Sequence, residues 1–104
     1  MKIMNIVGRD EYVKELIYGE ICFLRSMDSE YIIKLIDDFE DEENIYMVIE
    51  YCNSGDLYKY QNSLKDKVFT LKEAVSAMKD VIIGLEEVHK AGSIHRDIKN
   101  DNIL

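Results

Sequence analysis

At 104 residues the chain is long enough for one domain at most, or for part of one, and 47% apolar residues argue against wholesale disorder. A net charge of −8 argues against nucleic acid or an anionic membrane surface as a partner, because both require clustered basic residues. No apolar run approaches the roughly 20 residues of a transmembrane helix.

Two cysteines, Cys22 and Cys52, lack the spacing of metal ligands and are predicted to be free thiols in a reducing compartment. The N-terminus reaches Arg9, Asp10 and Glu11 too early for a signal peptide. These features predict a cytoplasmic location, with the nucleus as the alternative.

Residues 11–27 have the period of an amphipathic helix, with apolar side chains at Val13, Leu16, Ile17, Ile21 and Leu24. Glu20 lies on the same stripe, where a buried carboxylate is costly unless a cation meets it. Two interpretations stay open: Glu20 pairs with a cation, or it lies at the edge of the stripe and reaches water.

Two short runs, 31–39 and 45–51, are rich in β-branched and aromatic residues and flank the acidic stretch EDEEN at 40–44. This pattern predicts two strands joined by an acidic turn. The turn is most simply a solvated loop that keeps the hairpin soluble, and docking of a basic partner is the alternative.

A boundary between two subregions is predicted at NSGDL, residues 53–57, where a short helix or turn begins. The clearest helix follows, from Thr70 to Lys90. Thr70 and Glu73 form a capping box, and Gly92 is positioned to end the helix. The apolar stripe predicts a core helix and comprises Leu71, Ala74, Val75, Met78, Val81, Ile82, Leu85 and Val88.

The last twelve residues, SIHRDIKNDNIL, place polar groups between apolar ones. Asp97 and Lys99 are two apart and share a side in an extended stretch, and a compact loop could return Asn102 to the same site. An acid that accepts a hydroxyl proton, a cation for a phosphate and an amide oxygen for a metal form a set suited to phosphoryl transfer.

The stretch HRDIKNDN resembles the catalytic loop of protein kinases, His-Arg-Asp-x-x-x-x-Asn, and the lysine two after the aspartate resembles the serine/threonine branch. The rest of the chain agrees in order. YGEICFLRSMDSEYIIKLIDDF is similar to the small-lobe helix and the strand after it. NIYMVIEYCNSGDLYKY resembles the fifth strand, the hinge and the start of the large lobe, and TLKEAVSAMKDVIIGLEEVHKAGSIHRDIK resembles the long large-lobe helix entering the loop.

The resemblance implies an α+β, partial protein-kinase-like fold. Residues 1–49 would be a remnant of the small β-rich lobe, 50–56 the hinge, and 57–104 the start of the helical large lobe. The implied activity is transfer of the ATP γ-phosphate to serine or threonine hydroxyls of a protein substrate, with ATP and Mg²⁺ as cofactors.

The resemblance also implies residue roles. Asp97 would orient and deprotonate the substrate hydroxyl, Lys99 would steady the γ-phosphate, and Asn102 would hold Mg²⁺. Ile49 would be the gatekeeper, and the hinge from Glu50 to Cys52 would bind adenine through its backbone. Asp56 would approach the ribose, and Leu104 would lie under the adenine. Leu24 and His95 would be packing members of the spine that joins the lobes, with Leu35 nearby, and Arg96 would pair with an activation-loop phosphate.

Glu20 would be the family's ion-pairing glutamate, whose partner is a strand lysine about 18 to 20 residues upstream. Lys2 stands at that spacing, so it is the expected counter-ion and the expected contact to the α- and β-phosphates. The alternative is a frayed terminal lysine with no such role.

The 104 residues contain neither Gly-x-Gly-x-x-Gly nor Asp-Phe-Gly, so the chain is expected to be the middle of a kinase domain and to be inactive alone. The stripe of the 70–90 helix would face water or another molecule, which predicts a marginal or aggregation-prone product. The alternative functions are a truncated pseudokinase that acts as a binding module, and a non-functional gene fragment.

Overall fold

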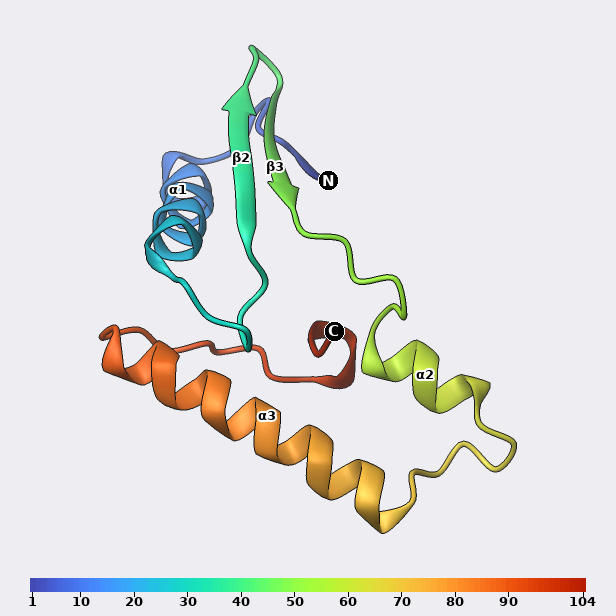
Figure 1. Ribbon diagram of the computed structural model, residues 1–104. Coiled ribbons are helices and arrows are strands. Elements are labelled where there is room, and N and C mark those ends of the chain that lie inside the picture. Colours follow the sequence, from blue (N-terminus) through green and yellow to red (C-terminus); the bar gives the residue numbers. More distant parts are fainter. The chain divides into compact units, whose positions relative to one another are not determined.

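The computed structural model describes residues 1–104 and divides into two compact units, 1–51 and 52–104. Unit 1 contains β1 (Lys2–Asn5), α1 (Glu11–Ser26), β2 (Leu35–Glu40) and β3 (Asn44–Ile49) (Figure 1). Unit 2 contains α2 (Leu57–Ser63), α3 (Leu71–Lys90) and a short 3₁₀ turn, η1 (Asn100–Asn102). The predicted α+β class is confirmed. The units divide after Tyr51, slightly before the boundary predicted at 53–57, and the assignment of 50–56 as a hinge stays a prediction.

The sheet of unit 1 has three antiparallel strands in the order β1-β3-β2. The prediction of a strand over 31–39 was wrong at its start, because β2 begins at Leu35. Ile32 and Ile33 are consecutive and both pack against the core. Successive residues of a strand point to opposite faces, so two neighbours that both pack inward favour a loop.

The core of unit 1 forms where α1 covers the central strand. Ile21 and Leu24 of α1 meet Ile45 and Met47 of β3, and all four are buried. Asp10 begins the helix by accepting a hydrogen bond from the backbone N–H of Tyr12. Burial of these apolar side chains is the main force that holds the helix on the sheet.

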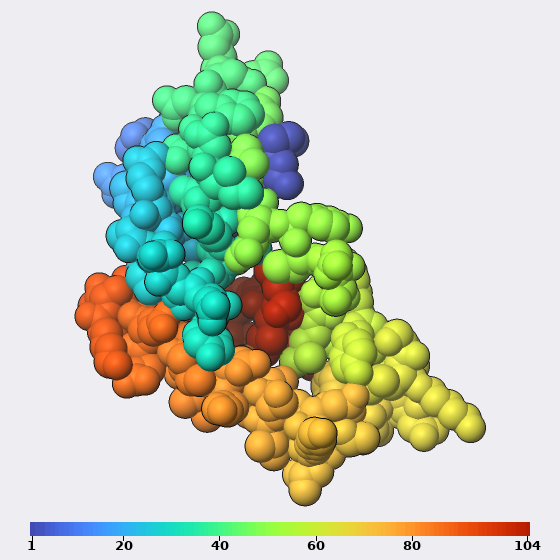
Figure 2. Space-filling model, in the orientation of Figure 1, coloured from blue at the N-terminus to red at the C-terminus, as the bar shows by residue number.

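The acidic turn between β2 and β3 is built by one of its own carboxylates. Asp41 Oδ1 accepts hydrogen bonds from the backbone N–H groups of Glu43 (2.8 Å) and Asn44 (2.7 Å). Its Oδ2 accepts one from the Tyr46 hydroxyl at 2.6 Å. These bonds lower the pKa of Asp41, with the Tyr46 contact as the largest cause. The turn therefore keeps its shape while it projects into solvent (Figure 2).

In unit 2 the predicted capping box of α3 is confirmed. Thr70 Oγ1 accepts a hydrogen bond from Glu73 N, and Glu73 Oε2 accepts one from Thr70 N at 2.8 Å. Gly92 follows the helix with φ +75°, a left-handed conformation that glycine adopts without steric cost. No helix in the structure combines the length and the apolar character needed to cross a membrane.

The stripe of α3 is only partly covered. Val88 is buried and Ala74 and Val81 are half-buried, but four stripe residues are each more than half exposed: Leu71, Val75, Met78 and Ile82. The prediction of a core helix was wrong for these positions in this chain, and the prediction that the stripe faces water holds for them. The helix is therefore capped locally while its apolar face stays open.

Two methionines allow a matched test of where the core lies. Met47→Ala should lower the free energy of unfolding by about 2 kcal/mol or more, because Met47 is 1% exposed and its removal leaves a cavity. Met78→Ala should change it by less than about 0.5 kcal/mol, because Met78 is 56% exposed. Urea unfolding followed by circular dichroism measures both, and equal effects would contradict this position of the core.

Candidate active site

The loop after α3 turns sharply at Arg96, whose φ of +66° lies in the left-handed region that a residue with a side chain rarely adopts. Such a conformation costs about 1 to 3 kcal/mol and recurs at functional sites, although Lys67 in the turn after α2 also adopts it, with φ +52°. Next to it, His95 Nδ1 accepts a hydrogen bond from Asp97 N at 3.2 Å. His95 itself is exposed in this structure, so the packing role predicted for it is not seen here.

Helix α2 holds the end of this loop in place. The backbone N–H of Leu57 donates to the carbonyl oxygen of Ile103 at 2.7 Å. Asn100 Nδ2 donates to Gln61 Oε1 at 3.2 Å. These two bonds connect the first and second turns of α2 to both ends of η1, and they fix the segment that carries Asn102.

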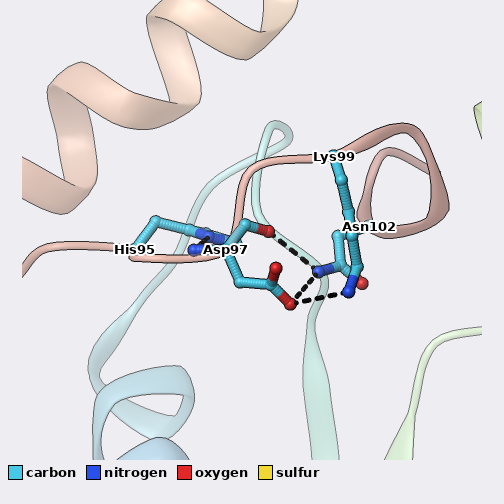
Figure 3. A network of polar contacts seen from close by, with 4 residues as sticks. All are labelled: His95, Asp97, Lys99 and Asn102. Carbon is cyan, nitrogen blue, oxygen red and sulfur yellow. Dashed lines mark hydrogen bonds and ion pairs between the residues drawn. The ribbon is translucent and has the colours of Figure 1, made fainter.

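Two predicted site residues, Lys99 and Asn102, converge on one carboxylate oxygen of a third, Asp97 (Figure 3). Lys99 Nζ lies 3.0 Å from Asp97 Oδ2. Asn102 Nδ2 donates to the same oxygen at 3.0 Å and to the backbone carbonyl of Asp97 at 2.9 Å. The compact loop expected from the spacing is therefore present, and it brings the acid, the amine and the amide together.

The two donors lower the pKa of Asp97, chiefly through the hydrogen bond from Lys99 and secondarily through the one from Asn102. Asp97 is therefore ionised at neutral pH. The side chains of Lys99 and Asp97 are 51% and 62% exposed, and an ion pair this exposed contributes little to stability. Stability alone does not account for the arrangement.

Two oxygens of the cluster accept no hydrogen bond, Asp97 Oδ1 and Asn102 Oδ1. Because the amide nitrogen of Asn102 faces Asp97, its oxygen points away from that carboxylate (Figure 3). An amide oxygen fits the preference of Mg²⁺, which takes one or two protein ligands beside phosphate oxygens and water. The structure contains no group of three or more His, Cys, Asp and Glu residues that could hold a metal by themselves.

In unit 1 the predicted pair of Lys2 and Glu20 is present. Lys2 Nζ donates to Glu20 Oε1 at 2.8 Å, and each side chain is 45% exposed. Both interpretations of Glu20 were partly right, since it lies at the edge of the stripe and also meets a cation. Lys2 is not frayed, because it begins β1 and pairs with Met47 of β3, while its contact with the phosphates stays a prediction.

Among the residues predicted to bind the nucleotide base and sugar, some polar groups are free and others already form hydrogen bonds. The carbonyl oxygen of Glu50 and the N–H of Cys52 form no hydrogen bond, while the Glu50 side chain accepts one from Lys34 N at 2.8 Å. Asp56 caps α2 by accepting from Lys59 N at 2.8 Å, and this bond is the largest cause of its lowered pKa. Leu104 is exposed.

Gln61, which anchors the loop through Asn100, was not predicted from the sequence. No local pattern identifies it, because the contact joins residues 39 positions apart. The cap that Asp56 forms on α2 was not predicted either, although an aspartate just before a helix is a strong N-cap signal.

Comparison with known proteins places the whole chain in one family. The family model described as protein kinase domain matches residues 1–104, so the chain belongs to the protein kinase family. The chain is 37% identical to a probable serine/threonine-protein kinase 2 of Plasmodium falciparum, over 98% of this chain and 20% of the relative.

Two further relatives are serine/threonine kinases. A MAP kinase-interacting serine/threonine-protein kinase of Caenorhabditis elegans is 36% identical over 100% of this chain and 14% of the relative. A serine/threonine-protein kinase H1 homolog of Pinctada fucata is 34% identical over 88% of this chain and 21% of the relative. The chain thus spans about a fifth or less of the length of these three relatives.

The pKa of Asp97 should depend on both of its neighbours. Lys99→Met should raise the pKa of Asp97 toward its ordinary value, and Asn102→Ala should raise it less, because the Lys99 contact is the larger cause. In the unchanged chain the contacts stay complete above the unfolded pKa of Asp97 and are lost as pH falls through its lowered folded pKa. Carboxyl ¹³C shifts followed against pH measure this.

Lys90→Met is the matched control. Lys90 pairs with Glu86 at 2.6 Å, so its loss should raise the pKa of Glu86 and leave that of Asp97 unchanged. An Asp97 titration that is the same with and without Lys99 would show that the cluster does not exist in solution.

Proposed function

We propose that the chain carries the phosphoryl-transfer residues of a serine/threonine protein kinase. The observation that carries this proposal is the convergence of Lys99 and Asn102 on one oxygen of Asp97, with the other oxygen left open. The chemistry suits a reaction in which catalysis depends on positioning and on charge stabilisation. The serine/threonine relatives support the substrate class.

Asp97 would act on the hydroxyl of the substrate. A carboxylate with a lowered pKa is a weak base, so its first contribution is to accept a hydrogen bond from the hydroxyl and aim its oxygen at the phosphoryl group. It would take the proton only as the new bond to phosphorus forms. Its free Oδ1 is available for this contact, while Lys99 and Asn102 hold Oδ2.

Lys99 and Asn102 would serve the phosphate side of the reaction. The Lys99 ammonium can stabilise the charge on the transferred phosphoryl group, and the free Asn102 oxygen fits a Mg²⁺ ligand. When bound, Mg²⁺ would neutralise charge on the ATP phosphates. Both side chains also fix Asp97, so each has a positioning effect besides its own contact.

Lys2 would contact the α- and β-phosphates of ATP, with Glu20 holding its ammonium in place. The unpaired carbonyl of Glu50 and N–H of Cys52 are groups that could receive the adenine base. Asp56 and Leu104 complete the proposed nucleotide contacts. Asp56 could receive a ribose hydroxyl only alongside its bond to the start of α2.

The 104-residue chain alone should show no kinase activity. It contains neither a Gly-x-Gly-x-x-Gly stretch to cover the nucleotide phosphates nor the Asp-Phe-Gly aspartate that binds Mg²⁺. These parts act together, so the loss is far from additive. A radiolabelled-ATP assay with basic protein substrates checks this, and turnover abolished by Asp97→Asn would overturn it.

A segment exchange tests the proposed function directly. Residues 1–104 should support kinase activity when they replace the matching segment of the Plasmodium falciparum relative. In that chimera Asp97→Asn should lower kcat by about 100-fold or more, because the substrate hydroxyl loses its acceptor. Peptide phosphorylation under steady-state conditions gives kcat and KM.

Asp101→Asn is the matched control, because Asp101 lies in the same loop and its side chain makes no hydrogen bond. It should leave kcat nearly unchanged. A folded chimera that binds ATP but transfers no phosphoryl group would instead support the alternative of a pseudokinase-type binding module.

A further inference from the structure

The sheet of unit 1 presents a row of three unlike side chains to α1. Lys2 of β1 and Asp38 of β2 are both direct cross-strand partners of Met47 on β3. Directly opposed residues point to the same face of a sheet, so Lys2, Met47 and Asp38 share the face that α1 covers. The row is basic at one edge, apolar in the centre and acidic at the other edge.

Helix α1 presents the complementary order. Its apolar residues Ile21 and Leu24 meet the central strand. At about 100° per residue, Glu20 falls on one flank of this apolar stripe and Arg25 on the other. Glu20 contacts Lys2, and Arg25 Nη2 contacts Asp38 Oδ1. The helix is acidic, apolar and basic where the sheet is basic, apolar and acidic.

A second contact lies on the same flank as Arg25. Tyr18 precedes Arg25 by two helical turns, and its hydroxyl donates to Glu40 Oε2 at 2.7 Å. Glu40 is the cross-strand partner of Ile45, the other fully buried residue of β3. The β2 edge of the sheet therefore holds α1 at two points, while the β1 edge holds it at Glu20.

We infer that Arg25 and Tyr18 are positioning residues, which hold α1 at the roll angle at which Glu20 meets Lys2. This inference rests on the proposed function for its catalytic meaning, because Lys2 matters only if it contacts the nucleotide. Neither residue would touch the nucleotide or the protein substrate. They would act by fixing the rotation of α1 through their contacts with the sheet.

Burial of Ile21 and Leu24 opposes a large roll of the helix, but apolar packing is non-directional and leaves small rotations open. An ion pair with both partners 45% exposed is weak alone, so Lys2 and Glu20 would not fix the rotation by themselves. Contacts on the opposite flank prevent the helix from rolling and keep Glu20 within reach of Lys2.

Carbodiimide cross-linking of the full 104-residue chain tests the inference without any nucleotide. The reagent joins a carboxylate to an amine in contact with it, and mass spectrometry measures the yield of the Lys2–Glu20 amide. Arg25→Met and Tyr18→Phe should each lower this yield, by about twofold to fivefold, as expected for the loss of a surface polar contact. The swap of Arg25→Asp with Asp38→Arg should restore it.

The controls lie on the same helix. Tyr12→Phe removes a hydroxyl that makes no hydrogen bond, and Lys14→Met removes a cation that pairs only with Glu11 at 3.7 Å. Both should leave the yield unchanged. The Lys90–Glu86 cross-link of α3 reports on the reagent, and amide exchange of β3 reports whether the sheet is intact.

An unchanged Lys2–Glu20 yield in both variants overturns the inference, and so does a yield that falls equally in the controls or does not recover in the charge swap. If Arg25→Met also speeds amide exchange of β3, Tyr18→Phe decides, since it removes only one oxygen. The cross-link requires no phosphoryl transfer, so an inactive chimera would leave this result intact and would count against the proposed function alone.

Discussion

Asp97 Oδ2 receives both Lys99 and Asn102, and the rest of the site depends on this meeting. The loop reaches it by a left-handed turn at Arg96, and α2 holds its far end through Leu57 and Gln61. With Oδ2 occupied, the carboxylate has one free oxygen and a fixed orientation. An exposed cluster of this kind adds little to stability, and its geometry suits the phosphoryl transfer proposed above.

Unit 1 also fixes the orientation of a polar pair, and it combines buried apolar side chains with exposed polar contacts to do so. Four buried side chains and their partly buried neighbours provide cohesion, and polar contacts at both sheet edges provide orientation. The polar contacts lie at the rim, where water weakens each of them. Several weak, directional contacts on opposite flanks of a helix oppose the small rotations that apolar burial tolerates.

Much of this could be predicted from the sequence where the determinants are local. The capping box at Thr70 and Glu73, the end of α3 near Gly92 and the period of α1 depend on residues within a few positions of each other. The loop motif was equally predictable, since Asp97, Lys99 and Asn102 lie within six residues. The pairing of Lys2 with Glu20 was reached only through the family resemblance.

The failures concern contacts across the fold. Residues 31–33 look like a strand but pack as a loop, because Ile32 and Ile33 both turn to the core. Gln61 and Arg25 gave no signal, since their partners Asn100 and Asp38 are determined by how elements pack. The open face of α3 at Leu71 and Val75 depends on what covers the helix, which periodicity alone does not specify.

The turn between β2 and β3 has a consequence for the range of conditions that the hairpin tolerates. The Tyr46 hydroxyl and the Asp41 carboxylate shift each other in opposite directions, lowering the pKa of Asp41 and raising that of Tyr46. Their bond is thus lost on the acid side only as pH falls through the lowered folded pKa of Asp41. On the alkaline side it is lost only as pH rises through the raised folded pKa of Tyr46. Between these limits the hydrogen bond that closes the acidic turn stays intact.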